Sequence, residues 1–133
     1  MKTIKQTIQF NCSANDFYEY FINPKKLSKI IGGKVVNSMK VPGKFSSYDN
    51  YIKGENIELL PGSKIVQNWT CVDFPDKHFS KVTINIKKKT DKSCEIELIQ
   101  ENVPDDLYED ISLLWNEFYW DPIKDYLEDL IWK

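Results

Sequence analysis

The sequence predicts an α+β fold in which a curved antiparallel sheet of about six to seven strands is wrapped round a long C-terminal helix, with two short helices after the first strand. Two observations predict the sheet: apolar and polar residues alternate in several runs before residue 104, and turn-forming pairs separate those runs. The third observation concerns the C-terminal segment. From residue 107 onward apolar residues recur at intervals of three and four, the pattern of an amphipathic helix that can lie across a whole sheet.

The N-terminal region is predicted to form one strand and two short helices. Apolar residues alternate with polar ones from Thr3 to Asn11, as in a strand that buries one face. Ser13 is placed to cap a short, strongly aromatic helix, and Pro24 is placed in the first turn of a second helix. The Gly32-Gly33 pair is expected to end that second helix.

Between residues 34 and 103 the sequence predicts an antiparallel meander. Short runs with strand character are separated by turn residues such as Pro42-Gly43 and Pro61-Gly62. Each strand is expected to bury one face and expose the other. The alternation is clearest in Lys64–Val72, Phe79–Lys87 and Cys94–Glu101.

The apolar stripe from Leu107 to Leu130 predicts one helix of roughly 25 residues. Pro122 lies within this stripe. Because proline has no N–H to donate to the preceding turn, we expect a kink in the helix at this position.

Size and charge limit the functions that the chain can have. Its 133 residues, 41% of them apolar and 29% charged, suit a single globular domain over residues 1–133. The net charge of −2, with 18 lysines and no arginine, argues against a general nucleic-acid binder. The charge is uneven, since residues 1–92 hold 16 lysines and 8 acids whereas residues 93–133 hold 2 lysines and 12 acids. These parts could pair with each other or face partners of opposite charge.

The cysteines and the N-terminus predict a reduced, cytoplasmic protein. Cys12, Cys71 and Cys94 are odd in number and have no C-x-x-C spacing, so we expect buried thiols rather than a disulfide framework or a zinc site. The alternating N-terminus does not resemble a signal peptide, and no stretch approaches 18 consecutive apolar residues. No membrane contact is therefore expected.

The sequence carries no recognisable catalytic motif. The one histidine, His78, lies beside a turn, and neither a nucleophile motif nor metal-ligand spacing accompanies it. Gly32-Gly33 follows a helix instead of joining a strand to a helix, so it does not indicate a phosphate-binding loop. We therefore expect a protein that is not an enzyme and has no catalytic, cofactor-binding or metal-binding residues.

A series of motifs follows one another along most of the chain. It comprises Gly43-Lys44-Phe45, Gly54-Glu55, Leu60–Gln67 leading to Trp69, Phe79-Ser80, Val82-Thr83-Ile84, Gln100, Val103-Pro104, Trp115, Tyr119 and Pro122-Ile123-Lys124. In this order and at these spacings, the region from about Ser13 through Lys124 resembles the C-terminal, Bet v 1/START-like domain of the activator of heat-shock protein 90 ATPase family.

The resemblance implies a helix-grip fold and a co-chaperone that binds heat-shock protein 90 and stimulates its ATPase activity. Related folds also hold hydrophobic small molecules between sheet and helix, so a carrier protein is the alternative, and an enzyme of the cyclase type is a third. An open apolar cavity of several hundred cubic ångströms would favour the carrier. A filled interior would favour a role in protein binding.

The sequence offers one set of candidate residues for the interior. Aromatic side chains could line a ligand cavity between sheet and helix, or they could form an ordinary close-packed core. The candidates are Phe45, Trp69, Phe79, Trp115 and Tyr119.

A second set of candidates concerns the surface. Leu113, Trp120 and Leu127 share a seven-residue spacing on the flank of the last helix, where they could contact a partner. Alternatively, the kink at Pro122 could turn Trp120 into the core. The run Lys87, Lys88 and Lys89 could meet an acidic chaperone surface or be a solvated turn.

Overall fold

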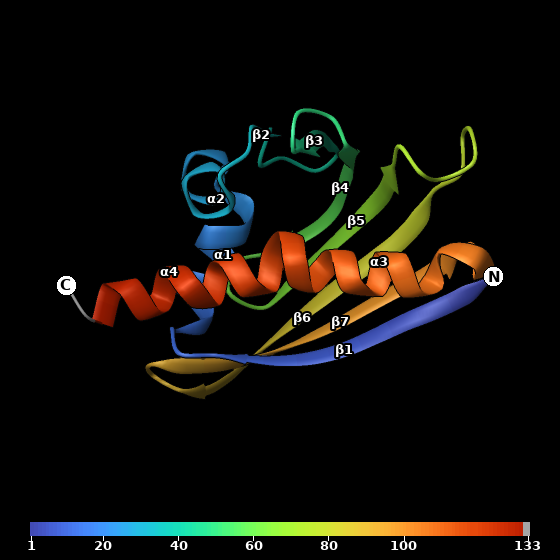
Figure 1. Cartoon of the computed structure of the whole chain (residues 1–133). Helices are drawn as coiled ribbons and strands as arrows, with labels where there is room; N and C mark the ends of the chain where they lie inside the picture. The colour runs from blue at the N-terminus through green and yellow to red at the C-terminus, as the bar shows by residue number, and fades with distance from the viewer. Residues whose placement is uncertain (132–133) are drawn as a thin grey trace.

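One antiparallel sheet carries a long helix across its concave face (Figure 1). The computed structural model describes residues 1–131. The strands are β1 (Lys2–Phe10), β2 (Val35–Asn37), β3 (Gly43–Ser47), β4 (Ile52–Leu60), β5 (Lys64–Cys71), β6 (Ser80–Thr90) and β7 (Ser93–Val103). The helices are α1 (Ala14–Ile22), α2 (Pro24–Ile31), the 3-10 turn η1 (Asp105–Leu107), α3 (Tyr108–Trp115), the π-helical turn η2 (Asn116–Trp120) and α4 (Asp121–Ile131).

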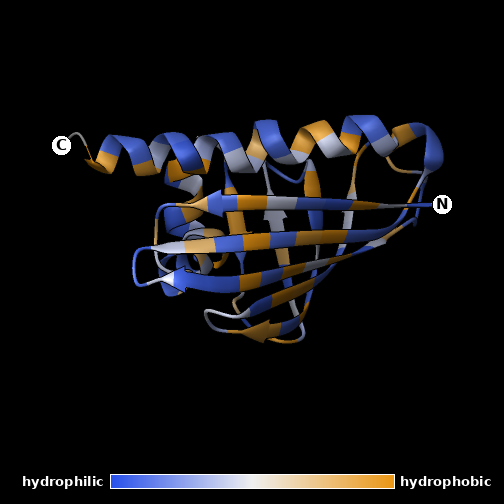
Figure 2. Ribbon diagram, turned by 90° about the horizontal axis from the view of Figure 1, so that it is seen from below, coloured by the Kyte–Doolittle hydropathy of each residue, from blue (hydrophilic) through white to orange (hydrophobic). Residues whose placement is uncertain are grey.

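Within residues 1–131 the sheet has seven strands in the order β1-β7-β6-β5-β4-β3-β2, and every neighbouring pair is antiparallel. The strands from β2 to β7 therefore form the expected meander, and β1 joins its far side by pairing with β7. Hydrophobic and hydrophilic bands alternate along the strands (Figure 2). The predicted α+β helix-grip architecture is confirmed.

The two short helices begin and end at the residues that the sequence indicates. The Ser13 hydroxyl accepts a hydrogen bond from the Asp16 N–H at 3.0 Å at the start of α1. Pro24 occupies the first turn of α2, and Gly32 ends that helix in the left-handed conformation, with φ of 73°. Gly33 then passes so close to the Tyr48 ring that an added Cβ would lie 2.8 Å from it.

The long helix contains a π turn, η2, immediately before Pro122. Pro122 has no N–H to donate to the Phe118 carbonyl, its acceptor in a regular α-helix. The Tyr48 hydroxyl donates to that carbonyl instead, at 2.7 Å. Tyr48 belongs to a turn in which it and the next two residues, Asp49 and Asn50, have φ of 52°, 54° and 70°. The hydrogen bond therefore ties a strained β3–β4 turn to the irregular part of the helix.

We expect Tyr48→Phe to lower the free energy of unfolding by about 1 kcal/mol at pH 7, because it removes this hydrogen bond. Burial, together with the nearby Glu117 carboxylate, raises the pKa of Tyr48 to about 12. A raised pKa in the folded state gives stability that is complete below about pH 10 and is lost as the pH rises toward 12. Urea unfolding of both proteins from pH 7 to 12 should show the difference shrinking above pH 10. A difference independent of pH would contradict this role.

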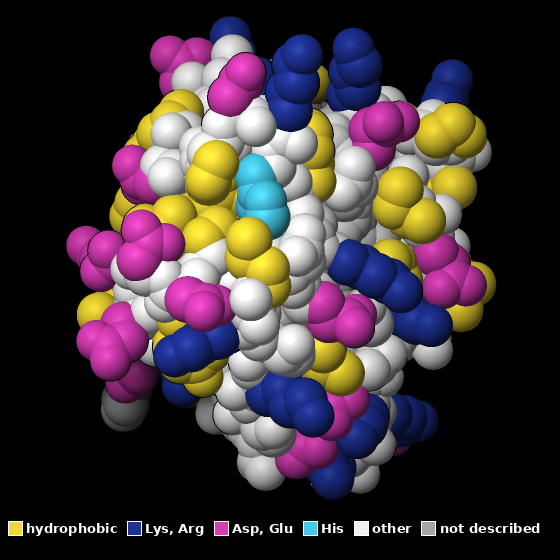
Figure 3. Space-filling view, turned by 90° about the vertical axis from the view of Figure 1, so that its right-hand side faces the viewer, with side chains coloured by type: hydrophobic (Ala, Val, Ile, Leu, Met, Phe, Trp, Pro, Cys, Tyr) yellow, Lys and Arg dark blue, Asp and Glu magenta, His cyan; other side chains and the backbone are white. Residues whose placement is uncertain are grey.

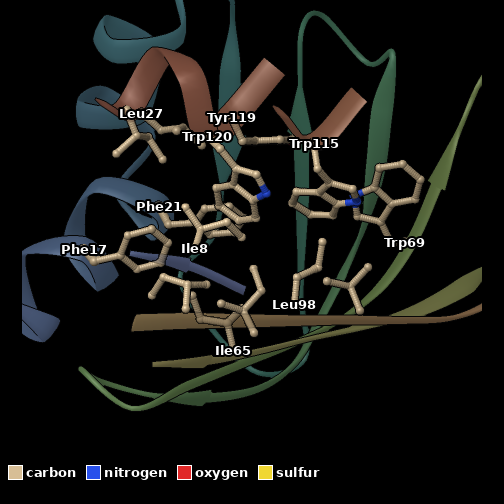
Figure 4. Packing of buried hydrophobic residues seen from close by; sticks show 14 of the residues in the cluster. Ile8, Phe17, Phe21, Leu27, Ile65, Trp69, Leu98, Trp115, Tyr119 and Trp120 are labelled. Atoms are coloured by element: carbon tan, nitrogen blue, oxygen red, sulfur yellow. The ribbon is translucent and has the colours of Figure 1, made fainter. Parts of the chain in front are cut away.

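Aromatic side chains dominate the space between helix and sheet (Figure 4). Trp115 lies at the centre and stacks on Trp69 of β5, on Trp120 and on Phe21 of α1, with ring centroids 5.9, 5.3 and 6.4 Å away. These contacts join three elements distant in sequence, so the core forms only when the helix docks on the sheet.

The three cysteines are reduced and buried, as the sequence predicts. No helix within residues 1–131 combines the length and hydrophobicity needed to span a bilayer.

Candidate functional site

The interior between sheet and helix is filled by side chains. Four of the five aromatic candidates, Phe45, Trp69, Trp115 and Tyr119, point into it and are at most 6% exposed. The cavity that Phe45 and Tyr119 help to line has a volume of about 10 Å³, room for a single water molecule. These residues therefore form a packed core in the structure.

The polar groups of this interior are paired with one another. The Trp115 indole donates to the Gln100 side-chain oxygen at 2.8 Å, and the Gln100 amide donates to the Ser80 hydroxyl at 2.8 Å. The Tyr119 hydroxyl donates to Ser47 at 3.0 Å, and burial raises the pKa of Tyr119. Within residues 1–131 every buried side-chain nitrogen or oxygen has a hydrogen-bond partner. The network therefore holds the helix on the sheet and leaves no group free for a ligand.

Phe79 does not line this interior, and its prediction as a cavity residue is wrong. Its neighbour Ser80 pairs with Trp69 and faces the core, so Phe79 faces outward because successive strand residues point to opposite faces. The Phe79 side chain is 39% exposed.

The predicted surface stripe on the last helix is also wrong at two of its three positions. Trp120 is 1% exposed and Leu127 is 7% exposed, whereas Leu113 is 63% exposed. The π turn adds a residue to one turn of the helix, which rotates the following positions by about 100° relative to a regular α-helix. Trp120 consequently lies in the core, where its indole donates to the Gln6 side-chain oxygen at 2.8 Å.

The remaining surface candidates lie at opposite ends of the molecule. Leu113 lies on the exposed face of α3, and the lysines lie at the β6–β7 hairpin (Figure 1). Lys88 contacts Asp91 at 3.0 Å and Lys89 contacts Glu95 at 3.9 Å, while Lys87 is exposed. The structure therefore does not combine these residues into one surface.

A different surface feature was not predicted from the sequence. A groove of about 620 Å³ lies on the sheet face that points away from the long helix, and we call it the outer groove. It combines exposed apolar side chains with lysines. Its lining residues are Val36, Lys44, Phe45, Ser46, Asn50, Lys53, Gly54, Glu55, Asn68 and Phe79.

Strand register places these residues side by side. Val36 of β2 lies opposite Ser46 of β3, which lies opposite Lys53 of β4. In a neighbouring row Lys44 lies opposite Glu55. Glu55 in turn lies opposite Asn68 of β5, so the outer groove depends on the pairing of four strands, with the 50% exposed Val36 at the edge of the sheet.

The Phe79 end of the outer groove is held by the β5–β6 hairpin. The Asn102 side chain donates to the Phe79 carbonyl at 2.9 Å, and a His78 ring nitrogen lies 2.8 Å from the Asn102 carbonyl. The His78 ring also packs against Phe74, which in turn contacts Trp69 of the core. Figure 3 shows His78 in cyan beside hydrophobic side chains at this end of the molecule. His78 therefore has a structural role in positioning the hairpin.

The charge of the outer groove favours an acidic partner. Two lysines, Lys44 and Lys53, and one acid, Glu55, line it. Neither lysine forms an ion pair in the part of the chain that the structure describes. Exposed apolar side chains beside free cations suit a protein surface that presents an apolar residue flanked by carboxylates.

Comparison with known proteins gives a family and a fold. The model of the family described as activator of Hsp90 ATPase homolog 1-like protein matches residues 11–128. The activator of 90 kDa heat shock protein ATPase homolog of Dictyostelium discoideum is 34% identical over 123 residues, which cover 92% of this chain and 32% of that protein. Homolog 2 from Mus musculus is 27% identical over 119 residues, covering 90% of this chain and 36% of that protein. The chain thus spans about a third of the length of these curated relatives.

A solved structure agrees with the fold. The crystal structure of an Hsp90 activator from Plasmodium falciparum superposes with a TM-score of 0.90 at 21% identity, covering 96% of this chain and 97% of that one. Likeness at this identity establishes the fold alone. Because the family model covers most of the sequence and a relative exceeds 30% identity, the chain belongs to the activator of Hsp90 ATPase homolog 1-like family.

Proposed function

We propose that this chain is a non-enzymatic co-chaperone that binds heat-shock protein 90 and stimulates its ATPase activity. The family match over residues 11–128 carries the proposal. The names of the curated relatives, which describe activators of this ATPase, support it. Since the chain corresponds to only a third of those relatives, the proposal is that this third is sufficient for a measurable effect.

The filled interior supports protein binding over the carrier alternative. A cavity of about 10 Å³ is far below the several hundred cubic ångströms of a typical small-molecule site. The buried polar residues in the described part of the chain are serine, threonine, asparagine and glutamine. The buried Tyr119 hydroxyl beside them already donates to Ser47, and burial raises its pKa, so this interior gives little support to the general acid or base that an enzyme of the cyclase type would need.

An activator of this kind works by differential binding. It accelerates hydrolysis only if it binds the hydrolysis-competent arrangement of the chaperone more tightly than the resting one. Equal binding to both would leave the equilibrium between the two arrangements unchanged. A tenfold stimulation requires about 1.4 kcal/mol of such preference. A few contacts from one small surface can supply that amount.

We propose the outer groove as the contact surface. Val36 and Phe79 provide apolar contact at its two ends, and Lys44 and Lys53 provide charge between them. The proposed occupant is an apolar side chain of the chaperone with carboxylates beside it. Such a contact weakens as salt screens the charges.

Steady-state ATP hydrolysis by the cognate heat-shock protein 90, with this chain titrated in, tests the proposed function. We expect a saturable rise above the activity that remains with a specific inhibitor of the chaperone. The rise should be smaller at 0.5 M salt than at 0.05 M, because salt shortens the Debye length over this range and so weakens the attraction between exposed charges. Absence of both a rise and a calorimetric binding signal would overturn the proposal.

A further inference from the structure

Two of the three buried cysteines meet at one end of the sheet. The β1–β7 register places Phe10 opposite Cys94, and Cys12 follows Phe10 by two residues, the spacing that returns a side chain to the same face. Cys12 is 7% exposed and Cys94 is 1% exposed, and the two side chains lie close enough for each thiol to shift the pKa of the other. Cys71 ends β5, whose final residue lies at the opposite end of the sheet.

We propose that Cys12 and Cys94 are a dithiol pair that hydrogen peroxide oxidises to a reversible disulfide. In the first step one of the two thiolates attacks one peroxide oxygen, the O–O bond breaks, and a sulfenic acid and hydroxide form; the hydroxide takes up the proton that the thiol lost. In the second step the other sulfur attacks the sulfenic sulfur and displaces hydroxide, which is protonated to water. The balance is two thiols and one peroxide giving one disulfide and two waters.

The two thiols influence one another. The contact with Cys94, together with burial, raises the pKa of Cys12. Either sulfur can make the first attack once it loses its proton, and the other then resolves the sulfenic acid.

A small oxidant has a route to this end of the sheet. Asn11 lines one surface hollow of about 410 Å³, and Ser13 lines another of about 330 Å³, so the residues on both sides of Cys12 border open space. Hydrogen peroxide is close in size to water and would reach the 7% exposed Cys12 first, whereas the 1% exposed Cys94 becomes accessible when this end of the sheet opens locally.

The disulfide would connect the β1–α1 junction to the beginning of β7. Those positions are far apart in the sequence and adjacent in the fold, so the bond would restrict the unfolded chain strongly and the folded chain little. This inference is independent of the proposed function, because it depends only on the two thiols.

Treatment of the reduced full chain with hydrogen peroxide tests the proposal. We expect a mass loss of two hydrogens, loss of two of the three thiols that react with Ellman's reagent in urea, and a cross-linked peptide pair containing Cys12 and Cys94. Dithiothreitol should restore all three thiols, and the oxidised chain should melt at a higher temperature than the reduced one.

Serine variants supply the matched controls. The Cys71→Ser chain lacks the third buried cysteine and should still lose two hydrogens on treatment with hydrogen peroxide. The Cys12→Ser and Cys94→Ser chains should not. Addition of oxygen atoms without a cross-link in the wild-type chain, retention of all three thiols, or a bond to Cys71 would each overturn the proposal. Because the cross-link is mapped in the wild-type chain, the test does not depend on the stability of any variant.

Discussion

Trp120→Ala is expected to destabilise the chain by about 3–5 kcal/mol, a large part of the stability of a domain of this size. Trp120 is buried among Phe10, Phe17 and Trp115, with ring centroids 5.9, 6.3 and 5.3 Å away, so alanine would leave a large cavity in the aromatic core. Alanine would also remove the donor to the side-chain oxygen of Gln6, whose amide donates to the helix carbonyl of Ser112 at 2.9 Å. Urea unfolding at pH 7 measures the effect.

Leu113→Ala is the matched control because Leu113 lies on the same long helix and is 63% exposed. Truncation of the Leu113 side chain to alanine should change the free energy of unfolding by no more than about 0.5 kcal/mol. Equal effects of the two substitutions on the free energy of unfolding would contradict the burial of Trp120. A Trp120→Ala chain that stays stable but binds the chaperone less tightly would show that Trp120 contacts the partner.

The burial of Trp120 also shows what the sequence pattern could not predict. Periodicity assigns helix faces correctly while the helix stays regular, as it does for Ile111, Leu114 and Trp115, which are buried. The π turn changes the phase after residue 115, and it forms together with a hydrogen bond from Tyr48, which is distant in the sequence. A local pattern carries no information about that contact. Pro122 indicated an irregularity at this place without specifying its kind.

The sheet was predictable to a greater extent, because its signals are local. Alternation predicted β1, β6 and β7 with the correct buried faces, as Ile4, Val82 and Leu98 show. Phe79 was assigned to the wrong face even though its odd position disagrees with the inward residues Val82 and Ile84 of the same run. That discrepancy was the one signal in the sequence that could have identified it as a surface residue.

The outer groove could not be predicted from the sequence. Its residues come from four strands and from the turns between them, so their proximity depends on the register of each strand pair. A register shift between Asn56 and Glu58 alters the β4–β5 pairing, and alternation within one strand does not reveal such a shift. The motifs that identify the family likewise say nothing about which side chains share this surface.

Phe79→Asp is expected to weaken binding to heat-shock protein 90 by about 30-fold or more, if the outer groove is the contact surface as we propose. An aromatic side chain that anchors an interface commonly contributes 2 kcal/mol or more, which corresponds to about 30-fold in affinity. The new carboxylate would also repel the acidic partner that Lys44 and Lys53 favour. Isothermal titration calorimetry measures the dissociation constant, and the ATPase titration should shift to higher concentrations by the same factor.

Val72→Asp is the control that separates a groove effect from a general effect of charge at the hairpin. Val72 lies in the same β5–β6 hairpin and is 65% exposed, but it does not line the outer groove. It should bind within about twofold of the wild-type chain, because exposed residues outside an interface contribute little. An equal loss of affinity in both variants would show that the outer groove is not the contact surface. The proposed co-chaperone function would still stand in that case, provided that the wild-type chain binds in the same experiment. Loss confined to Phe79→Asp, with an unchanged melting temperature, would place the chaperone contact on the face of the sheet opposite the long helix.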